Sequence, residues 1–230
     1  MRNQAGFTLI EIAIVLVIIG LLLGGVLKGQ ELITSARVRN LISQQDGVKA
    51  AYFGFLDRFR SPPGDYGLAT TNIAGATVNG NGNGQIQSML GGGTIDEHIA
   101  VWEHLSRSGF INGTYTYAAL PETANSVPTN VYAHTRYIQV IDDAVYGTGG
   151  GAVRHNVKTG NQIPSNIMAE VDRKVDDGNP VGGMFQFSTY NGGQGGTSPT
   201  PTGAGGCYIA GPAPSWGAPT VSNCGGASLL

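Results

Sequence analysis

Residues 1–27 read MRNQAGFTLIEIAIVLVIIGLLLGGVL, and this stretch decides the fold of the chain. From Phe7 to Leu27 the side chains are almost wholly apolar, and Glu11 carries the only charge. As an α-helix this run would be about 31 Å long, which is enough to cross the hydrocarbon core of a bilayer. A carboxylate inside a membrane span is costly and normally has a partner and a function. We therefore predict a transmembrane helix over 7–27 in which Glu11 has a specific role.

Two ordinary explanations of this start leave features unexplained. A secretory signal peptide has a shorter apolar core followed by a small-residue cleavage site, whereas this run is long, contains a Glu and has no A-x-A sequence after it. A plain signal anchor fits the length but explains neither Glu11 nor the Gly6-Phe7 step ahead of the apolar run. Arg2 is the only charged side chain before the run, so charge alone is a weak guide to orientation.

Residues 6–11 spell G-F-T-L-I-E at the junction. In residue types, spacing, N-terminal position and the apolar run that follows, this motif resembles the processing site of type IV pilins and type II secretion pseudopilins. The resemblance implies that a prepilin peptidase cuts between Gly6 and Phe7 on the cytoplasmic side and then N-methylates Phe7. Residues 1–6 would be the leader peptide, and residues 7–27 would remain as the membrane and assembly helix.

The resemblance also implies a partner for Glu11, namely the terminal amine of Phe7 in a neighbouring subunit. In a packed bundle of helices each buried charge would satisfy the other and would set the axial stagger between subunits. The alternative is that Glu11 snorkels toward the lipid headgroups near a helix end. Gly20 and Gly24 form a G-x-x-x-G spacing that lets helices approach closely. Lys28 stands where many major pilins have a proline.

The apolar pattern continues beyond the membrane in an amphipathic form over residues 28–60. Its apolar positions are mostly three, four or seven residues apart, which is typical of a helix with one buried face. A Ser-Pro-Pro-Gly sequence at 61–64 ends the pattern. One helix from Phe7 to Arg60 would be about 80 Å long. The apolar positions are Leu32, Ile33, Ala36, Leu41, Val48, Tyr52, Phe55, Leu56 and Phe59.

Residues 61–230 are predicted to form one small head domain. Glycine supplies 37 of the 230 residues and charged residues only 12%, so we expect long connections and a surface with few charges. Thr94 and Glu97 form a capping box ahead of an apolar helix face, and a Gly/Pro-rich loop is expected from Asn191 onward. The patterns predict helices at 94–106 and 166–176, and strands at 114–118, 137–141 and 184–188.

The predicted fold class is therefore α+β. As the pilin resemblance implies, the long N-terminal helix would pack on a small antiparallel sheet, and the C-terminal part of the head would be rich in loops.

Cys207 and Cys224 are the only cysteines. With the head outside the cytoplasm, as the resemblance implies, they should form a disulfide, and the bond would bound a C-terminal loop as in many pilins. Metal ligation and redox catalysis are the alternatives. No Cys or His lies between the two cysteines, and a redox site would favour a C-x-x-C pair.

Two segments raise the possibility of calcium. Asn79, Asn81 and Asn83 echo the spacing of a calcium loop, but amides replace its carboxylates and a leucine stands at the twelfth position, so a turn is favoured. Asp172, Asp176 and Asp177 at the end of a predicted helix could bind calcium, as some pseudopilins do in the head. The alternative is an ordinary turn, with Arg173 pairing with Asp177 along the helix. We expect no cofactor, with calcium as the open alternative.

No enzyme motif is recognisable. The four histidines, His98, His104, His134 and His155, have no metal-ligand spacing, and neither a phosphate loop nor G-x-S-x-G occurs. The formal net charge is −2, and loss of Arg2 with the leader would make it −3, so bulk charge does not favour nucleic-acid binding.

The predicted function is that of a structural subunit of a type IV pilus or type II secretion pseudopilus, and not of an enzyme. The predicted partners are the prepilin peptidase, like subunits in a helical filament, the lipid bilayer, and an inner-membrane platform with its ATPase. Before assembly the protein would cross the bacterial inner membrane once, with its N-terminus cytoplasmic and its head periplasmic. The alternatives are a minor pilin or adhesin that binds a ligand, and a tethered periplasmic protein that does not polymerise.

Overall fold

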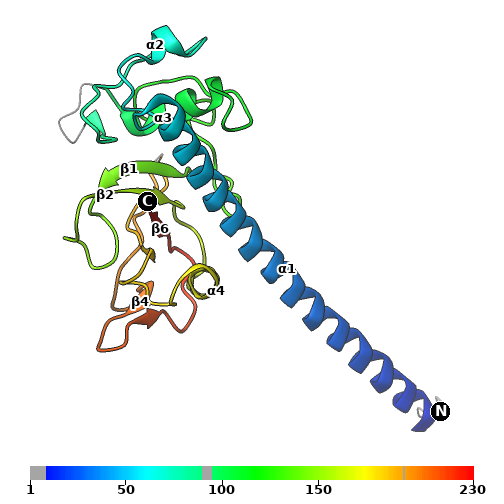
Figure 1. Cartoon of the computed structure of the whole chain (residues 1–230). Helices are drawn as coiled ribbons and strands as arrows, with labels where there is room; N and C mark the ends of the chain where they lie inside the picture. The colour runs from blue at the N-terminus through cyan, green and yellow to red at the C-terminus, as the bar shows by residue number, and fades with distance from the viewer. Residues whose placement is uncertain (1–8, 90–94, 194) are drawn as a thin grey trace. The chain divides into compact units, whose positions relative to one another are not determined.

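The computed structural model describes residues 9–89, 95–193 and 195–230 (Figure 1). The chain divides into two compact units, Met1–Val38 and Arg39–Leu230. Helix α1, Leu9–Phe59, begins in the first unit and ends in the second. The long helix predicted from the sequence is therefore confirmed over the described residues.

The end of α1 follows from local backbone geometry. Arg60 has a φ of 57°, in the left-handed region that a helix cannot continue through, and its N–H still bonds the carbonyl oxygen of Leu56 at 2.9 Å. Pro62 and Pro63 follow and cannot donate helical hydrogen bonds. The predicted stop at the Ser-Pro-Pro-Gly sequence is confirmed.

In the head unit, α1 buries one face. Leu41, Val48, Tyr52 and Phe55 are spaced by seven, four and three residues, and all are buried. The buried Phe55 ring lies 6.1 Å from the ring of Phe110 between centroids. This face is one wall of the main hydrophobic core.

Helix α3, Glu97–Arg107, supplies a second wall of that core and lies beside the C-terminal end of α1 (Figure 1). Ile99, Trp102 and Leu105 are fully buried, as the predicted apolar face requires. The start of the helix differs from the prediction, because Asp96 is the N-cap residue and Thr94 lies outside the described residues. A one-turn helix, α2, covers Ala69–Asn72.

The head contains a four-stranded antiparallel sheet in the order β1-β2-β6-β3. The final strand of the chain thus occupies an inner position and pairs on both sides. Two short strands form a separate antiparallel pair, and helix α4 contacts β5 and β3. The elements are β1 Gln139–Asp143, β2 Arg154–Lys158, α4 Ser165–Val175, β3 Phe185–Phe187, β4 Tyr208–Ile209, β5 Ser215–Trp216 and β6 Gly226–Leu229.

Three predicted elements are present with shifted bounds, and one predicted strand is wrong. The strands predicted at 137–141 and 184–188 are β1 and β3, and the helix predicted at 166–176 is α4. The strand predicted at 114–118 does not form, because its backbone bonds loops and side chains and not a neighbouring strand. The N–H of Tyr117 donates to Oε1 of Glu103 at 3.2 Å, and the N–H of Thr116 donates to the carbonyl oxygen of Asn125 at 3.0 Å.

The loop expected from Asn191 onward is present over most of that stretch, but three short strands interrupt it. They are β4, β5 and β6, and β6 completes the main sheet. Strand β2 was not predicted either. Its sequence, RHNVK, lacks the apolar alternation of a half-buried strand, yet Asn156, Val157 and Lys158 are all buried.

Candidate functional site

The first candidate site is the apolar half of α1 in the first unit. Among the described residues, α1 is the helix that is long and apolar enough to cross a membrane, judged by length and composition. Its apolar side chains in this half are exposed: Leu9, Leu21 and Leu27 keep 88%, 74% and 67% of their surface. Such a surface is stable only when lipid or other protein covers it.

Glu11 lies in the first turn of α1, where the positive end of the helix dipole favours a carboxylate. At about 100° per residue, Glu11 and Gly20 point to opposite sides of the helix, whereas Gly24 lies within about 40° of Gly20. The glycine pair and the carboxylate therefore face different neighbours in any bundle. Gly6 and Phe7, the predicted processing residues, lie outside the described residues.

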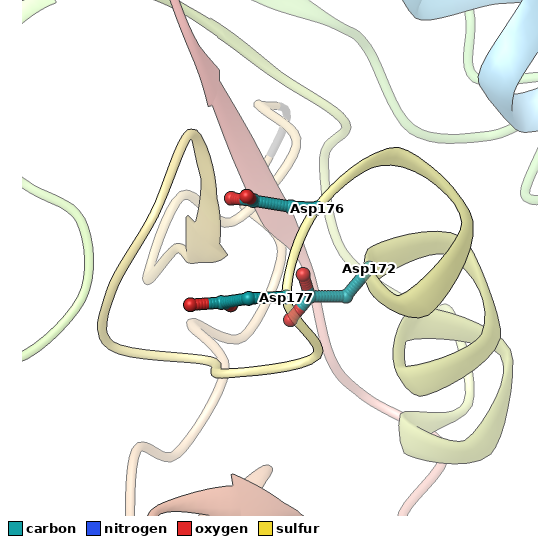
Figure 2. A group of neighbouring side chains, drawn as sticks. All are labelled: Asp172, Asp176 and Asp177. Carbon is teal, nitrogen blue, oxygen red and sulfur yellow. The ribbon is translucent and has the colours of Figure 1, made fainter.

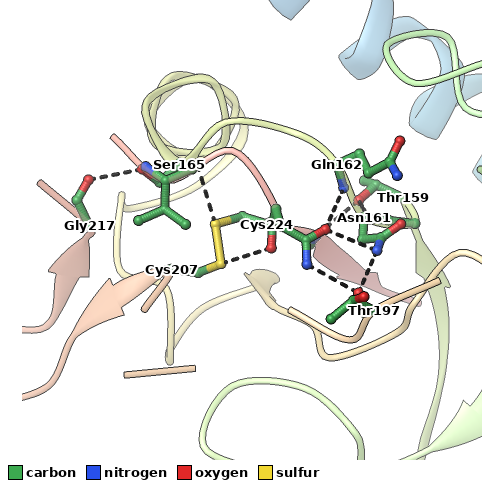
Figure 3. The surroundings of a disulfide bond; sticks show 12 residues. Thr159, Asn161, Gln162, Ser165, Thr197, Cys207, Gly217 and Cys224 are labelled. Carbon is green, nitrogen blue, oxygen red and sulfur yellow. Dashed lines mark hydrogen bonds between the residues drawn. A yellow bond between two sulfur atoms is a disulfide. The ribbon is translucent and has the colours of Figure 1, made fainter. Parts of the chain in front are cut away.

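The second site is the disulfide in the C-terminal part of the head (Figure 3). The Cys207 and Cys224 sulfur atoms are 2.09 Å apart, and both residues are fully buried. Cys224 also exchanges two backbone hydrogen bonds with Ile163, of 2.8 and 3.1 Å, just before α4. The disulfide expected from the sequence is present, and it fastens the β4–β5 loop to the body of the head.

The third site is the group of three aspartates at the end of α4 (Figure 2). One ligand oxygen from each of Asp172, Asp176 and Asp177 lies within 4.8 Å of the others, so a cation could reach all three. Asp172 is fully buried, and both of its oxygens already accept hydrogen bonds. Nε1 of Trp216 donates to Oδ2 at 2.7 Å, and the N–H of Gly178 donates to Oδ1 at 3.2 Å.

The other two aspartates hold the chain that follows α4. Oδ2 of Asp176 accepts hydrogen bonds from the N–H groups of Met184 and Phe185, the latter at 2.8 Å. Oδ1 of Asp177 accepts one from the N–H of Asn179 at 2.8 Å. The predicted pairing of Arg173 with Asp177 is wrong, because the guanidinium of Arg173 bonds Glu170 at 2.6 Å.

Asn79, Asn81 and Asn83, the other calcium candidates, belong to a loop that wraps around buried carboxylates. The Asp65 carboxylate accepts from the N–H groups of Asn83 and Gly84 at 3.0 and 2.9 Å. The Glu97 carboxylate accepts from the N–H groups of Asn81 and Gln87 at 2.9 and 3.0 Å. Here Glu97 holds a distant loop, which is a different role from the capping-box role predicted for it. Burial raises the pKa of Glu97.

The histidines have structural partners. His104 is fully buried; its Nδ1 accepts from the N–H of Gly64 at 2.9 Å, and its Nε2 donates to the carbonyl oxygen of Val78 at 3.0 Å. Nδ1 of His155 shares a hydrogen bond of 2.7 Å with the hydroxyl of Tyr52, which connects β2 to α1. Nε2 of His98 lies 3.6 Å from Oε1 of Glu122, and both side chains are buried. These three histidines lie in separate places, as their sequence spacing suggested.

Sequence reasoning missed the residues that organise this head. Asp65, Glu103 and Trp216 drew no attention, although each makes a buried or half-buried bond that fixes a loop. No local signal in the sequence marks these roles, because each residue bonds a segment that lies 19 to 44 residues away along the chain.

Comparison with known proteins adds one match. Residues 1–27 match a family model described as the prokaryotic N-terminal methylation motif. No curated protein and no solved structure matches the chain. A motif of this type points to a structural protein rather than an enzyme. The chain thus carries the N-terminal methylation motif that is the hallmark of the type IV pilin and pseudopilin family, ahead of a long helix and a head with a small antiparallel sheet.

Proposed function

We propose that the protein is a structural subunit of a type IV pilus or a type II secretion pseudopilus. The observation that carries the proposal is the methylation motif over residues 1–27, which includes most of the exposed apolar half of α1. A helix with this surface is stable in a bilayer, and it is equally stable in a bundle of like helices. Transfer from the first setting to the second is the physical basis of assembly from the membrane.

In this proposal the prepilin peptidase cuts after Gly6 and methylates the amine of Phe7. The Glu11 carboxylate then pairs with the Phe7 amine of a neighbouring subunit. The pair would fix the axial register of the subunits, because a subunit with the wrong stagger would leave two buried charges unpaired, at a cost of several kcal/mol. Gly20 and Gly24, on the opposite side of the helix, would allow a second neighbour to approach closely.

The proposed topology places the N-terminus in the cytoplasm and the head in the periplasm, in one pass through the bacterial inner membrane. The platform protein and its ATPase would then extract the subunit into the filament. The buried disulfide supports this topology, because disulfides persist in oxidising compartments.

The test is Glu11→Ala, with Glu31→Ala as the matched control. Glu31 lies on the same helix beyond the apolar run and pairs with Lys28 at 2.6 Å on an exposed surface. Fibres sheared from cells are labelled through a tag on the head and viewed by electron microscopy, and membrane fractions are probed in parallel. We expect Glu11→Ala to insert into the membrane normally but to leave fibres without label, and Glu31→Ala to assemble like the parent.

Normal fibres from Glu11→Ala would contradict the proposed pairing. The labelling pattern of the parent protein separates the remaining roles. Label along whole fibres indicates a major pilin, and label at tips or at sparse points indicates a minor subunit with a binding role. Unlabelled fibres, with the protein in the inner membrane and its mature N-terminus at Phe7, indicate a short pseudopilus. An uncut N-terminus would contradict processing, and Gly6 replaced by a large residue is the reference for that uncut form.

A further inference from the structure

The chain contains five Asn-Gly dipeptides. Asn-Gly is the dipeptide most prone to spontaneous deamidation. In this reaction the glycine nitrogen attacks the side-chain carbonyl carbon of the asparagine, and glycine offers no side chain to obstruct the approach. The reaction needs a glycine N–H that is free to move and an asparagine side chain that is free to rotate. The pairs are Asn79-Gly80, Asn81-Gly82, Asn83-Gly84, Asn112-Gly113 and Asn191-Gly192.

The glycine nitrogens of the three consecutive pairs at 79–84 are all held. The N–H of Gly80 donates to the carbonyl oxygen of Tyr66 at 3.0 Å. The N–H groups of Gly82 and Gly84 both donate to Asp65, to its carbonyl oxygen at 2.9 Å and to its carboxylate at 2.9 Å. Attack by any of these nitrogens first requires the loop to open.

The asparagine side chains of the same loop are also engaged. Oδ1 of Asn79 accepts from the N–H of Thr70 at 2.8 Å, Oδ1 of Asn81 accepts from the N–H of Asn83 at 2.9 Å, and Oδ1 of Asn83 accepts from the N–H of Gln85 at 2.8 Å. The segment that looks most reactive in the sequence is therefore protected by the fold.

The pair near the C-terminal region is held by burial. Gly192 is buried, and its carbonyl oxygen accepts a hydrogen bond from the N–H of Tyr137 at 3.0 Å. Oδ1 of Asn191 accepts one from the N–H of Gly193 at 3.0 Å. Ring closure at this pair must break the bond to Asn191 and move the buried backbone of Gly192, which requires local opening.

Asn112-Gly113 differs from the other four pairs because the fold holds neither residue. Both residues are exposed, as are those at 81–84, and they lie in the turn that follows α3. Within the described part of the chain, neither the Asn112 side chain nor the N–H of Gly113 makes a hydrogen bond. Gly113 has a φ of 102°, a conformation that glycine adopts and that residues with a side chain rarely do.

From this contrast we infer that Asn112 is the site at which the folded protein deamidates. The nitrogen of Gly113 bonds Cγ of Asn112, the bond from Cγ to Nδ2 breaks, and the proton lost by Gly113 leaves with the amide nitrogen as ammonia. Solvent water then opens the five-membered ring at either carbonyl, which gives aspartate or isoaspartate. Each outcome places a new carboxylate at position 112.

The new charge would arise at a defined place on the head. Asn112 lines a groove along α1, beside Gly47, Phe110 and Val131. The lining of this groove contains no carboxylate before the reaction, since its other residues are Asn40, Ser43, Gln44, Val48 and Ile111. Deamidation therefore adds a negative charge to a groove with an uncharged lining.

The experiment is peptide mapping of the full protein after incubation at mildly alkaline pH in water enriched in oxygen-18. Trypsin separates the candidate sites, because Arg107 and Arg136 bracket the peptide with Asn112, and the three clustered pairs and Asn191 lie in other peptides. Label incorporation and the isoaspartate fragment pattern report each site. We expect conversion at Asn112 to exceed that at each other pair by about tenfold or more, since a held pair reacts only through local opening.

The same protein unfolded in urea is the control, and there all five pairs should convert at similar rates. Asn112→Gln should remove the labelled product from its peptide without raising conversion elsewhere. Equal or faster conversion within 79–84 in the folded protein would overturn the assignment, and so would no conversion at Asn112. An unchanged ranking after unfolding would show that local sequence, and not the fold, selects the site.

Discussion

The indole Nε1 of Trp216 donates a 2.7 Å hydrogen bond to Oδ2 of the fully buried Asp172. Trp216 lies between the two cysteines of the disulfide, and Asp172 lies on α4. The bond therefore joins the disulfide loop to the helix that carries the aspartate group. The disulfide closes the loop at its two ends, and between them the loop is held to α4 by this bond and by the Ser165 hydroxyl, which donates to the carbonyl oxygen of Gly217 at 3.0 Å and accepts from the N–H of Val221 at 3.0 Å.

Asp172 should make the stability of the head depend on pH. Burial, with the neighbouring charges of Asp177 and Asp176, raises its pKa from 3.8 to about 6. The folded state thus holds the proton more tightly than the unfolded chain, so this contribution to stability is complete below pH 3.8 and is lost as the pH rises through about 6. In Asp172→Asn the group is neutral at every pH. Relative to the parent, we expect the variant to gain up to about 3 kcal/mol in unfolding free energy between pH 4 and pH 7, measured by urea unfolding. A difference that does not change with pH would contradict the assignment.

His104 should give the stability of the head the opposite pH dependence to that of Asp172. Burial lowers its pKa below 6.5, because protonation would place a charge in the core and break the bond from the N–H of Gly64 to Nδ1. Its contribution to stability is present above pH 6.5 and is lost as the pH falls. His104→Ala would leave the buried N–H of Gly64 and the half-buried carbonyl of Val78 without this partner and should cost about 3 kcal/mol at pH 7.5, with a smaller cost at pH 5.5. The matched control is His134→Ala, at an exposed histidine, which should change stability little. Equal costs at the two pH values would refute the neutral-histidine assignment.

The disulfide should stabilise the head without determining its helices. The bond joins residues 17 apart in the sequence, and the chain-entropy treatment gives about 3 kcal/mol for such a loop. We expect Cys207→Ala with Cys224→Ala to lose about that amount of unfolding free energy by urea titration. The helical signal in the far-ultraviolet circular dichroism spectrum of the whole protein, to which α1 and α3 contribute, should be unchanged. A double variant as stable as the parent would show that packing alone secures the loop.

The three aspartate carboxylates accept hydrogen bonds from N–H groups of the protein, and we therefore predict that they do not bind a calcium ion. Both oxygens of Asp172 are already taken by N–H donors, which leaves the group short of the six to eight oxygens that calcium prefers. We expect the melting temperature to be the same in calcium and in a chelator. A calcium-dependent rise that Asp177→Asn abolishes would establish a calcium site and overturn this prediction.

The long helix could be predicted because its signal is carried by many residues of one kind. The apolar run fixes the first half, the spacing from Leu41 to Phe55 fixes the buried face of the second half, and two prolines follow its end. The helix predicted at 166–176 succeeded for the same reason, since Ile167 and Val171 mark one buried face.

Strand β2 could not be predicted, because its stability comes from partners that are distant in the sequence. The buried ammonium of Lys158 is neutralised by Asp143, on the paired strand, and Asn156 donates to the same carboxylate at 3.0 Å. Read alone, Asn156 and Lys158 are solvent-facing residue types. Only the pairing of β1 with β2 brings the compensating carboxylate to them.

The candidate sites likewise contain some residues that the sequence could predict and others that it could not. The processing motif is local, so residues 6–11 identify it without a structure, and the cysteine pair follows from there being only two cysteines. The loop contacts of Asp65 and Glu97 depend on which backbone N–H groups the fold brings to them, and no local pattern specifies these contacts.

The burial of carboxylates has a consequence for how copies of this head meet. Of the 15 acidic residues in the chain, six are withdrawn from solvent: Asp65, Asp96, Glu97, Glu103, Glu122 and Asp172. The remaining surface has few charges, so two heads approaching one another meet little long-range repulsion, and salt has little to screen. In the proposed filament, close lateral packing of these heads should therefore vary little between dilute and saline surroundings.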